Sequence, residues 1–267
     1  SPFTVAFDAP AAMADGVAYD SLQAALAAGG NIVLTKNAIV SENLVIDKAT
    51  TLNLNGKTIT SNWEKTGNEL YALRTNAAVT IANGTVVVGQ ARALNASADL
   101  TLKNVTISQD LTGGHACVAL SGEKSNYTVT GSTIEGAYAL CVFADNVTLT
   151  IDNSKLEGKT LGLYHNGSNC GLNLNVTGTT INGGNEGTDA TGVYISGSTT
   201  TRDKGGYQKA TFTNCTIKGN AAVEVKYTDL TLNNCTAIAT VTSDNASYVQ
   251  NNNGATTNGF AVVSTDN

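Results

Sequence analysis

Residues 127–136 read YTVTGSTIEG, and residues 149–158 read LTIDNSKLEG. Both segments alternate apolar and polar residues, are interrupted by two small or polar residues, and then resume the alternation. Alternation with a period of two is typical of a strand that has one buried face. Each segment therefore predicts two short strands joined by a sharp bend.

The same pattern occurs six more times, so the chain is built from an internal repeat. The further copies are TLNLNGKTI (51–59), VTIANGTVV (79–87), LTLKNVTIS (100–108), LNVTGTTIN (174–182), ATFTNCTIK (210–218) and LTLNNCTAI (230–238). At each interruption stands a Gly or an Asn, the residues that most readily adopt a left-handed backbone. We expect the chain to bend at Gly56, Gly84, Asn104, Gly131, Asn153, Gly178, Asn214 and Asn234.

A third short apolar segment occurs once per repeat. These segments are YALRT (71–75), RALNA (92–96), CVALS (117–121), ALCVF (139–143), GLYHN (162–166), GVYIS (192–196), AVEVK (222–226) and FAVVS (260–264). Three strands per repeat predict a coil in which each strand pairs with its counterpart in the next turn, at ~4.8 Å. The expected fold is all-β, a single-stranded right-handed parallel β-helix of about nine to ten coils.

These features resemble the right-handed parallel β-helix of the pectate-lyase-like superfamily. TTLNLNGKTIT (50–60) is similar to a phrase of secreted bacterial surface proteins in that group, and residues 18–46 resemble the N-terminal helix and first coil of such domains. We expect residues 1–30 to form an N-terminal segment with a short capping α-helix, and residues 31–267 to form the β-helix, together one domain. Asp20 is expected to cap the helix, with Gln23 in a capping-box-like position.

Alternation also predicts which residues fill the coil. The residue after each bend should point inward. Cys215 and Cys235 are such residues in adjacent repeats, so we expect them to stack in the interior as two reduced thiols. His165 should point inward, level with Val142 and Ile195. Two positions beyond the first inward residue, an aliphatic row is expected to supply much of the core: Ile59, Val87, Ile107, Ile134, Leu156, Ile181 and Ile217.

Composition excludes several classes of function. The net charge of −6 argues against nucleic-acid binding, which needs a basic face. No segment approaches the ~18 consecutive apolar residues of a membrane span. The five cysteines lack the spacing of a zinc site, and no His–carboxylate spacing indicates a metal site. We therefore expect no transmembrane segment, no metal and no cofactor.

Glu135 and Glu157 occupy equivalent positions of adjacent repeats. Their expected separation is close to the ~5–5.5 Å between the two carboxylates of a retaining glycosidase. However, every stacked pair of surface residues in such a coil has this spacing, and Lys155 should partly neutralise the two glutamates. We expect a solvated polar ladder at this position.

Long connections flank the third strand and should form walls, so the outward row of this strand is expected to be the floor of a groove. The predicted floor consists of Arg74, Asn95, Ala119, Cys141, Tyr164, Tyr194 and Glu224. Aromatic faces suit sugar rings, although tyrosine also occurs on strands without any ligand. The candidate binding residues are Tyr164, Tyr194, Glu224, Lys226, Arg74 and, on one wall, Trp63.

The resemblance does not fix an activity, because that superfamily contains lyases, hydrolases, adhesins and structural spacers. A polyuronide lyase of this kind needs an arginine or lysine base beside clustered acidic calcium ligands. A polygalacturonase-like hydrolase needs several aspartates on neighbouring rungs. The predicted floor offers Arg74 at one end and no cluster of aspartates, so we expect no catalytic residue.

The sequence favours a non-catalytic, extracellular or cell-surface module. The partner would be a polysaccharide or a host or cell-surface glycan, bound in the groove as by an adhesin, and the chain would be a monomer or one module of a longer protein. A carbohydrate-active enzyme, either a polysaccharide lyase or a glycoside hydrolase, and a purely structural spacer are the alternatives.

Overall fold

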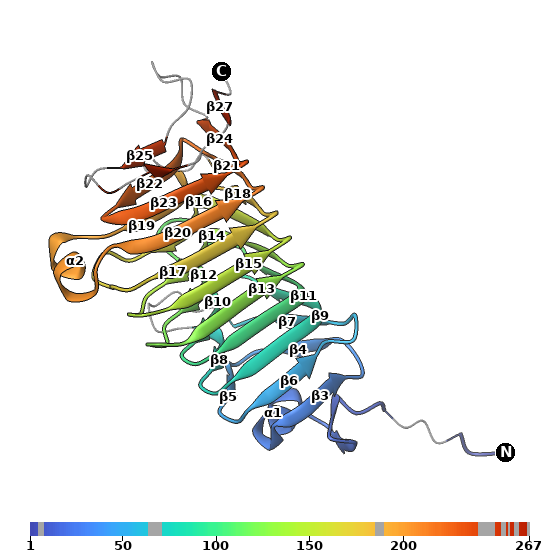
Figure 1. The fold of residues 1–267 in the computed structure, drawn as a ribbon. Coiled ribbons are helices and arrows are strands. Elements are labelled where there is room, and N and C mark those ends of the chain that lie inside the picture. The colour runs from blue at the N-terminus through green and yellow to red at the C-terminus, as the bar shows by residue number, and fades with distance from the viewer. Residues whose placement is uncertain are drawn as a thin grey trace.

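The computed structural model is a coil of stacked strands (Figure 1). It describes residues 1–4, 8–63, 71–184, 190–239, 249–251, 255, 257–258 and 262–265. The strands form a parallel β-solenoid of about nine turns, as the repeat predicts. Three sets of stacked strands run along the coil, and we call them ladders one, two and three in the order in which the chain enters them.

Ladder one carries the first half of each sequence repeat and faces the viewer in Figure 1. Its strands are parallel and in register, with Thr128 opposite Thr150 as one example. The strands are β3 (Gly30–Leu34), β6 (Thr50–Asn53), β9 (Val79–Val88), β11 (Leu100–Gln109), β13 (Asn126–Thr130), β15 (Thr148–Asp152), β17 (Asn173–Thr177), β20 (Gln208–Thr213), β23 (Thr228–Asn233) and β26 (Thr257–Asn258).

Ladder two carries the second half of each repeat. Strands β9 and β11 continue into it from ladder one, and the first halves of β14 (Thr133–Val142) and β16 (Lys155–His165) belong to it. The remaining strands are β4 (Ala38–Val40), β7 (Thr58–Ser61), β18 (Thr180–Asn182), β21 (Thr216–Gly219), β24 (Thr236–Ala239) and β27 (Val262–Thr265).

Ladder three contains the predicted third strands. The second halves of β14 and β16 lie in it, because these two strands run through the corner without a break. The other members are β5 (Leu44–Ile46), β8 (Tyr71–Thr75), β10 (Arg92–Ala96), β12 (Ala116–Leu120), β19 (Thr191–Ser196), β22 (Ala221–Lys226) and β25 (Val249–Asn251).

The three corners of the coil differ in how much their length varies. From β13 to β24, a pair of residues joins ladder one to ladder two in every turn. The connections on either side of ladder three vary widely, from none within β14 and β16 to residues 197–207, which contain the helix α2 (Thr199–Gly205). Variation in chain length is therefore concentrated beside ladder three.

Seven of the eight predicted bend residues have a left-handed backbone, and the exception is Gly84. In that turn Asn83 takes the left-handed conformation, with φ of 62°. Gly84 is required for a different reason, since a Cβ there would lie 2.4 Å from the Cβ of Leu54. The glycine allows close packing and does not mark the bend.

This shift by one residue also corrects the predicted core. Val86 pairs with Ile59 and Ile107 and is 1% exposed, whereas Val87 is 37% exposed on the outer face. The prediction that Val87 belongs to the aliphatic row is therefore wrong, because the bend one residue earlier reverses the faces. The other six predicted members are buried.

The prediction that the residue after each bend points inward is wrong at Thr85, which pairs with Thr58 and Thr106 on the outer side because the bend lies at Asn83. The predictions for Cys215, Cys235 and His165 are confirmed. The amide of Cys215 lies 3.4 Å from Sγ of Cys235, and all five cysteines are free and buried. His165 is buried opposite Val142 and Ile195.

The N-terminal helix α1 (Leu22–Ala28) is present, but Ser21 caps it instead of Asp20. Oγ of Ser21 accepts a hydrogen bond from the amide of Ala24 at 3.1 Å. Gln23 takes no part in the cap, since its side-chain amide bonds the backbone of Val45 in the first coil. Before the helix, β1 (Ala12–Ala14) pairs antiparallel with both β2 (Val17–Tyr19) and β3, and so covers the edge of ladder one.

The end of the chain differs from the prediction for residues 260–264. Strand β27 pairs with β24 and therefore extends ladder two, whereas β25 extends ladder three. Residues 260–261 lie outside the described residues. Within the described part of the chain, no helix is long and apolar enough to cross a membrane.

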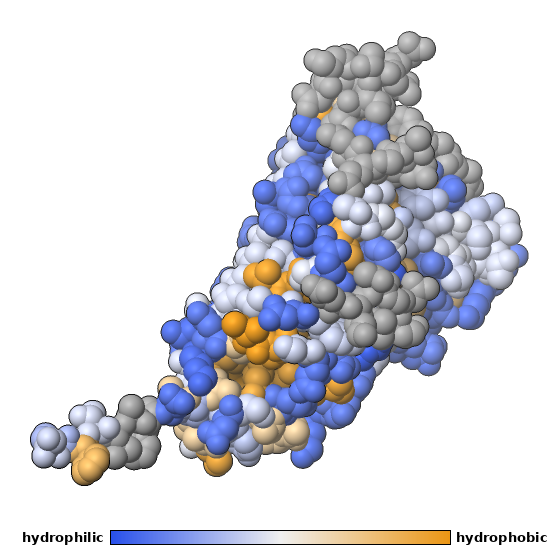
Figure 2. Space-filling model, turned by 180° about the vertical axis from the view of Figure 1, so that it is seen from behind, coloured by the Kyte–Doolittle hydropathy of each residue, from blue (hydrophilic) through white to orange (hydrophobic). Residues whose placement is uncertain are grey.

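The outward row of ladder two changes character along the coil. Ile39 is 73% exposed, and Thr60 separates it from the exposed Val87. Further along, the same row becomes polar with Ser108 and Glu135. Seen from behind, the coil shows hydrophobic surface gathered among hydrophilic side chains (Figure 2).

Candidate functional site

The outward row of ladder three has the predicted register. Arg74 pairs with Asn95, Asn95 with Ala119, Ala119 with Cys141, Cys141 with Tyr164, Tyr164 with Tyr194, and Tyr194 with Glu224. Two hollows of about 550 and 380 Å³ lie over this row, and Tyr138 and Tyr164 line both of them. The two hollows therefore adjoin at these tyrosines, and we call them together the ladder-three groove.

Tyr164 and Tyr194 form the aromatic part of this groove. Their rings stack with centroids 5.8 Å apart and an interplanar angle of 17°. Tyr138 and Phe143 meet Tyr164 edge-on at 5.8 and 6.0 Å. Burial raises the pKa of Tyr164, so its phenol stays protonated at neutral pH. The arrangement fixes an aromatic surface that spans two rungs.

Lys226 and Glu224 lie at one end of the groove. Nζ of Lys226 donates a hydrogen bond to the hydroxyl of Tyr194 at 3.1 Å and lies 5.5 Å from the centroid of that ring. Glu224 lines the same hollow. Both charged residues therefore lie beside the tyrosine pair, as the sequence predicts.

The opposite end of the groove contains two arginines around Tyr71. The guanidinium carbons of Arg74 and Arg92 lie 5.4 and 5.8 Å from the centroid of the Tyr71 ring. Arg74 is half-buried, whereas Arg92 is 6% exposed. Nη2 of Arg92 donates to Nδ1 of His115 at 3.2 Å, because a guanidinium has no acceptor.

Between the two ends, the residues predicted for the floor are covered. Ala119 and Cys141 occupy the middle rungs, are fully buried and line neither hollow. They lie in one cluster with Tyr71, against which Tyr138 and Tyr164 pack. Burial raises the pKa of the Cys141 thiol, so this cysteine is inert. The groove floor therefore does not include Ala119 and Cys141.

Sequence reasoning missed a second row of groove residues. Tyr71, Arg92, Tyr138, Leu161 and Thr191 each lie at or near the entry of the chain into ladder three, and all five line the hollows. Alternation assigns these positions to the interior. A charged residue such as Arg92 at an apparently interior position was the signal that could have revealed this row.

The structure does not bring Trp63 to the groove lining. Its side chain is half-buried and packs against the main core, and its amide bonds Oγ of Ser61 at 3.3 Å. Two of the long connections that were expected to form walls, residues 61–70 and 183–190, lie partly outside the described residues.

The polar ladder around Glu157 has the predicted ion pair. Nζ of Lys155 lies 3.0 Å from the Glu157 carboxylate, which also accepts a hydrogen bond from Asn182 at 2.6 Å. Glu135 pairs with Glu157 in register. The Glu157 carboxylate is thus occupied by a cation and an amide.

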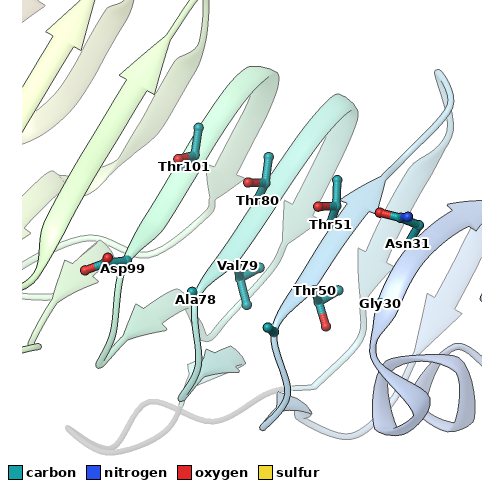
Figure 3. A pocket seen from close by; sticks show the side chains of 10 residues that line it. Gly30, Asn31, Thr50, Thr51, Ala78, Val79, Thr80, Asp99 and Thr101 are labelled. Atoms are coloured by element: carbon teal, nitrogen blue, oxygen red, sulfur yellow. The ribbon is translucent and has the colours of Figure 1, made fainter.

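A further shallow hollow of about 350 Å³ lies on ladder one near the N-terminus. Asn31, Thr51, Thr80 and Thr101 stand in one row across it, in register from strand to strand (Figure 3). Its single charged lining residue is Asp99, which already accepts a hydrogen bond from the amide of Asn126. The ladder-three groove, with aromatic and charged side chains, is the stronger candidate.

Metal binding has no support in the described part of the chain, where no group of three His, Cys, Asp or Glu residues is placed to hold an ion. The candidate site combines aromatic, amide, hydroxyl and basic side chains with the carboxylate of Glu224.

The fold is similar to that of two solved structures. Geobacillus virus E2 ORF18 has a TM-score of 0.52 and 11% identity, over 84% of this chain and 50% of that one. The Dettilon tailspike protein has a TM-score of 0.50 and 10% identity, over 84% of this chain and 52% of that one. This chain thus spans about half the length of these proteins. The sequence matches no protein-family profile and no curated protein.

Proposed function

We propose that this chain is a non-catalytic β-helix module that binds a glycan in the ladder-three groove. The stacked pair Tyr164–Tyr194 carries the proposal, because two nearly parallel rings on adjacent rungs place aromatic surface in the groove, against which the C–H groups of a sugar can pack. Lys226 and Glu224 add a donor and an acceptor at its edge. A tailspike protein among the structures of similar fold is in keeping with a surface role.

The proposal includes a secreted or cell-surface location and an adhesin-like role toward a polysaccharide or host glycan. Kinship with the pectate-lyase-like superfamily belongs to the same proposal and rests on the repeat pattern. The chain would act as a monomer or as one module of a longer protein.

The test is affinity electrophoresis through gels that contain pectin, alginate, mucin or other plant and host glycans. The variant Tyr164→Ala/Tyr194→Ala should lose the retardation that the wild type shows with its ligand. The matched control is Tyr207→Ala/Tyr227→Ala, which removes a tyrosine pair outside the groove, with centroids 6.2 Å apart. Equal retardation of both double variants would overturn the proposed site, provided both melt cooperatively.

The two alternatives predict different results. A carbohydrate-active enzyme would release product from one of these polymers, and Glu224→Gln should abolish that release. A structural spacer would show neither retardation with any polymer nor product.

A further inference from the structure

We infer that Cys215 and Cys235 form a stabilising disulfide bond when the protein folds in an oxidising environment. The structure holds both side chains as free thiols and therefore describes the reduced state. The two cysteines lie at the bend between ladders one and two, and the inference does not depend on glycan binding. It rests on the register of the strands, on the direction of the two side chains and on the placement of the other cysteines.

The two cysteines occupy the same position in adjacent turns. Strand β20 pairs with β23 before the bend and β21 pairs with β24 after it, both in the register that places Cys215 opposite Cys235 (Figure 1). Neighbouring strands lie ~4.8 Å apart, and the Cα atoms of disulfide-bonded cysteines lie ~4.4–6.8 Å apart. The backbone therefore already has the spacing that a disulfide requires.

The two thiols also approach each other in the interior. Each cysteine is 2% exposed, and Sγ of Cys235 accepts a hydrogen bond from the amide of Cys215 at 3.4 Å. The Cys235 thiol donates to the carbonyl oxygen of Phe212 at 3.4 Å, so its sulfur lies toward the turn that contains Cys215. A hydrogen bond from the Cys215 side chain lowers the pKa of Cys235, which favours the Cys235 thiolate as the nucleophile of the pair.

Hydroxyl groups occupy the same interior row in the earlier turns. The side-chain oxygens of Ser132, Ser154 and Thr179 each accept a hydrogen bond from a backbone amide of the preceding turn, at 3.1, 3.1 and 3.3 Å. Cys235 makes the same contact with Cys215, and serine would serve equally well for that contact alone. Thiols in two adjacent turns add the capacity to form a bond with each other.

The other cysteines are not placed to form a disulfide. Ala119 pairs with Cys141, which puts Cys117 two residues out of register with Cys141. Residues displaced in this way on neighbouring strands lie ~7–8 Å apart, and cysteines more than ~7 Å apart cannot bridge without movement of the backbone. Cys170 lies in a connection, beside Gly205 of α2. The structure therefore predicts one specific bond and leaves the remaining cysteines as thiols.

The bond forms by thiol–disulfide exchange with a small disulfide such as oxidised glutathione. The Cys235 thiolate attacks one sulfur of the oxidant, which gives a mixed disulfide and releases one glutathione thiol. The Cys215 thiolate then attacks the Cys235 sulfur, which forms the protein disulfide and releases the second glutathione thiol. The protons of the two cysteines pass through solvent to the released thiols. Since both cysteines are buried in the folded coil, the exchange takes place during folding, before the turns close.

The bond would close a loop that contains one whole turn of the coil, because the two cysteines are 20 positions apart in the chain. This turn includes β22, which carries Glu224 and Lys226 at one end of the ladder-three groove. A disulfide that closes such a loop restricts the unfolded chain, and we expect the melting temperature to rise by roughly 5–10 °C.

The experiment refolds the reduced full chain in a buffer that contains reduced and oxidised glutathione. The remaining thiols are alkylated, and digestion with mass spectrometry identifies the linked peptides. We expect one pair of peptides joined through Cys215 and Cys235, two hydrogen atoms lighter than the separate peptides, and alkylation of Cys117, Cys141 and Cys170. Thermal melting then compares this oxidised protein with the same protein after treatment with dithiothreitol.

The variants Cys215→Ser and Cys235→Ser keep a hydrogen-bonding group at each position and remove the bond. Each should melt at the same temperature after refolding with or without oxidised glutathione. The matched control is Cys170→Ser, which removes a thiol outside the pair. It should retain the linked peptides and the rise in melting temperature on oxidation.

Three results would overturn the inference. Alkylation of all five cysteines after refolding would mean that the two thiols serve as hydrogen-bonding groups alone, like Ser132 and Ser154. A bond that includes Cys117, Cys141 or Cys170 would contradict the register argument. A bond between Cys215 and Cys235 that leaves the melting temperature unchanged or lowers it would contradict the stabilising role. Glycan binding is measured separately, so the proposed function stands or falls without regard to these results.

Discussion

His165 lies directly on Val142 in the interior of the coil, and neither of its ring nitrogens has a hydrogen-bond partner among the described residues. Burial lowers the pKa of His165 to about 4, against a smaller opposing effect of Asp145. The imidazole is therefore neutral in the folded protein at physiological pH.

This burial makes folding sensitive to acid. The unfolded chain takes up a proton at this histidine near pH 6.5, whereas the folded protein does so near pH 4. Stability should therefore be complete above about pH 6.5 and fall by about 3 kcal/mol as the pH drops to about 4. Urea unfolding at several pH values measures the loss. His165→Leu should largely remove it, while His115→Gln, outside the interior row, should not; equal pH dependence of wild type and His165→Leu would contradict the assignment.

Ile181→Asp should prevent folding. Ile181 is fully buried between Leu156 and Ile217, so the substitution places a charge without a partner in the core. Thr180→Asp is the control, because Thr180 points outward beside Lys155. Circular dichroism and thermal melting should show a cooperative transition for Thr180→Asp and none for Ile181→Asp. A cooperative melt of the latter would mean that the interior register is wrong.

Gly84→Ala should destabilise the coil by about 1–3 kcal/mol. The new methyl group would lie 2.5 Å from the carbonyl oxygen of Lys57 and close to Leu54, and backbone cannot move aside cheaply. Gly89→Ala is the matched control, since no atom lies within 4 Å of its Cβ position. Denaturant titration of the two variants compares them directly, and equal midpoints would refute close packing as the reason for the glycine.

Ser21→Ala should cost about 1 kcal/mol of stability, because it leaves the amide of Ala24 without its cap. Asp20→Ala should be nearly neutral by the same measurement. The reverse order of the two effects would restore Asp20 as the cap.

The period of the sequence predicts the three ladders and almost every outward residue of ladder three, because alternation and a repeated bend leave few alternative registers. The prediction of bend positions fails where a glycine can serve either to turn the backbone or to leave room for a neighbouring side chain. At Gly84 the requirement is space beside Leu54, and the bend falls on Asn83. The sequence alone does not distinguish a glycine with a left-handed backbone from a glycine against which a neighbouring side chain packs closely.

The residues of the candidate site also fall into those that the sequence predicts and those that it does not. The stacking of Tyr164 on Tyr194 follows from register, so it was predictable. The contribution of Tyr71 and Arg92 was not, because residues next to a corner do not obey the alternation of the strand that they begin. Trp63 was assigned to a wall from loop length, and its packing against the core depends on tertiary contacts that loop length does not encode.

The unequal corners have a consequence for how this protein can change. Adding a residue at the paired bend between ladders one and two would turn the next strand over and expose its core side chains. Adding residues at either corner beside ladder three leaves every rung in register and alters the rim of the groove alone. Ligand preference can thus diverge by insertion and deletion while the interior stays unchanged, and a foreign binding loop is best grafted at residues 197–207.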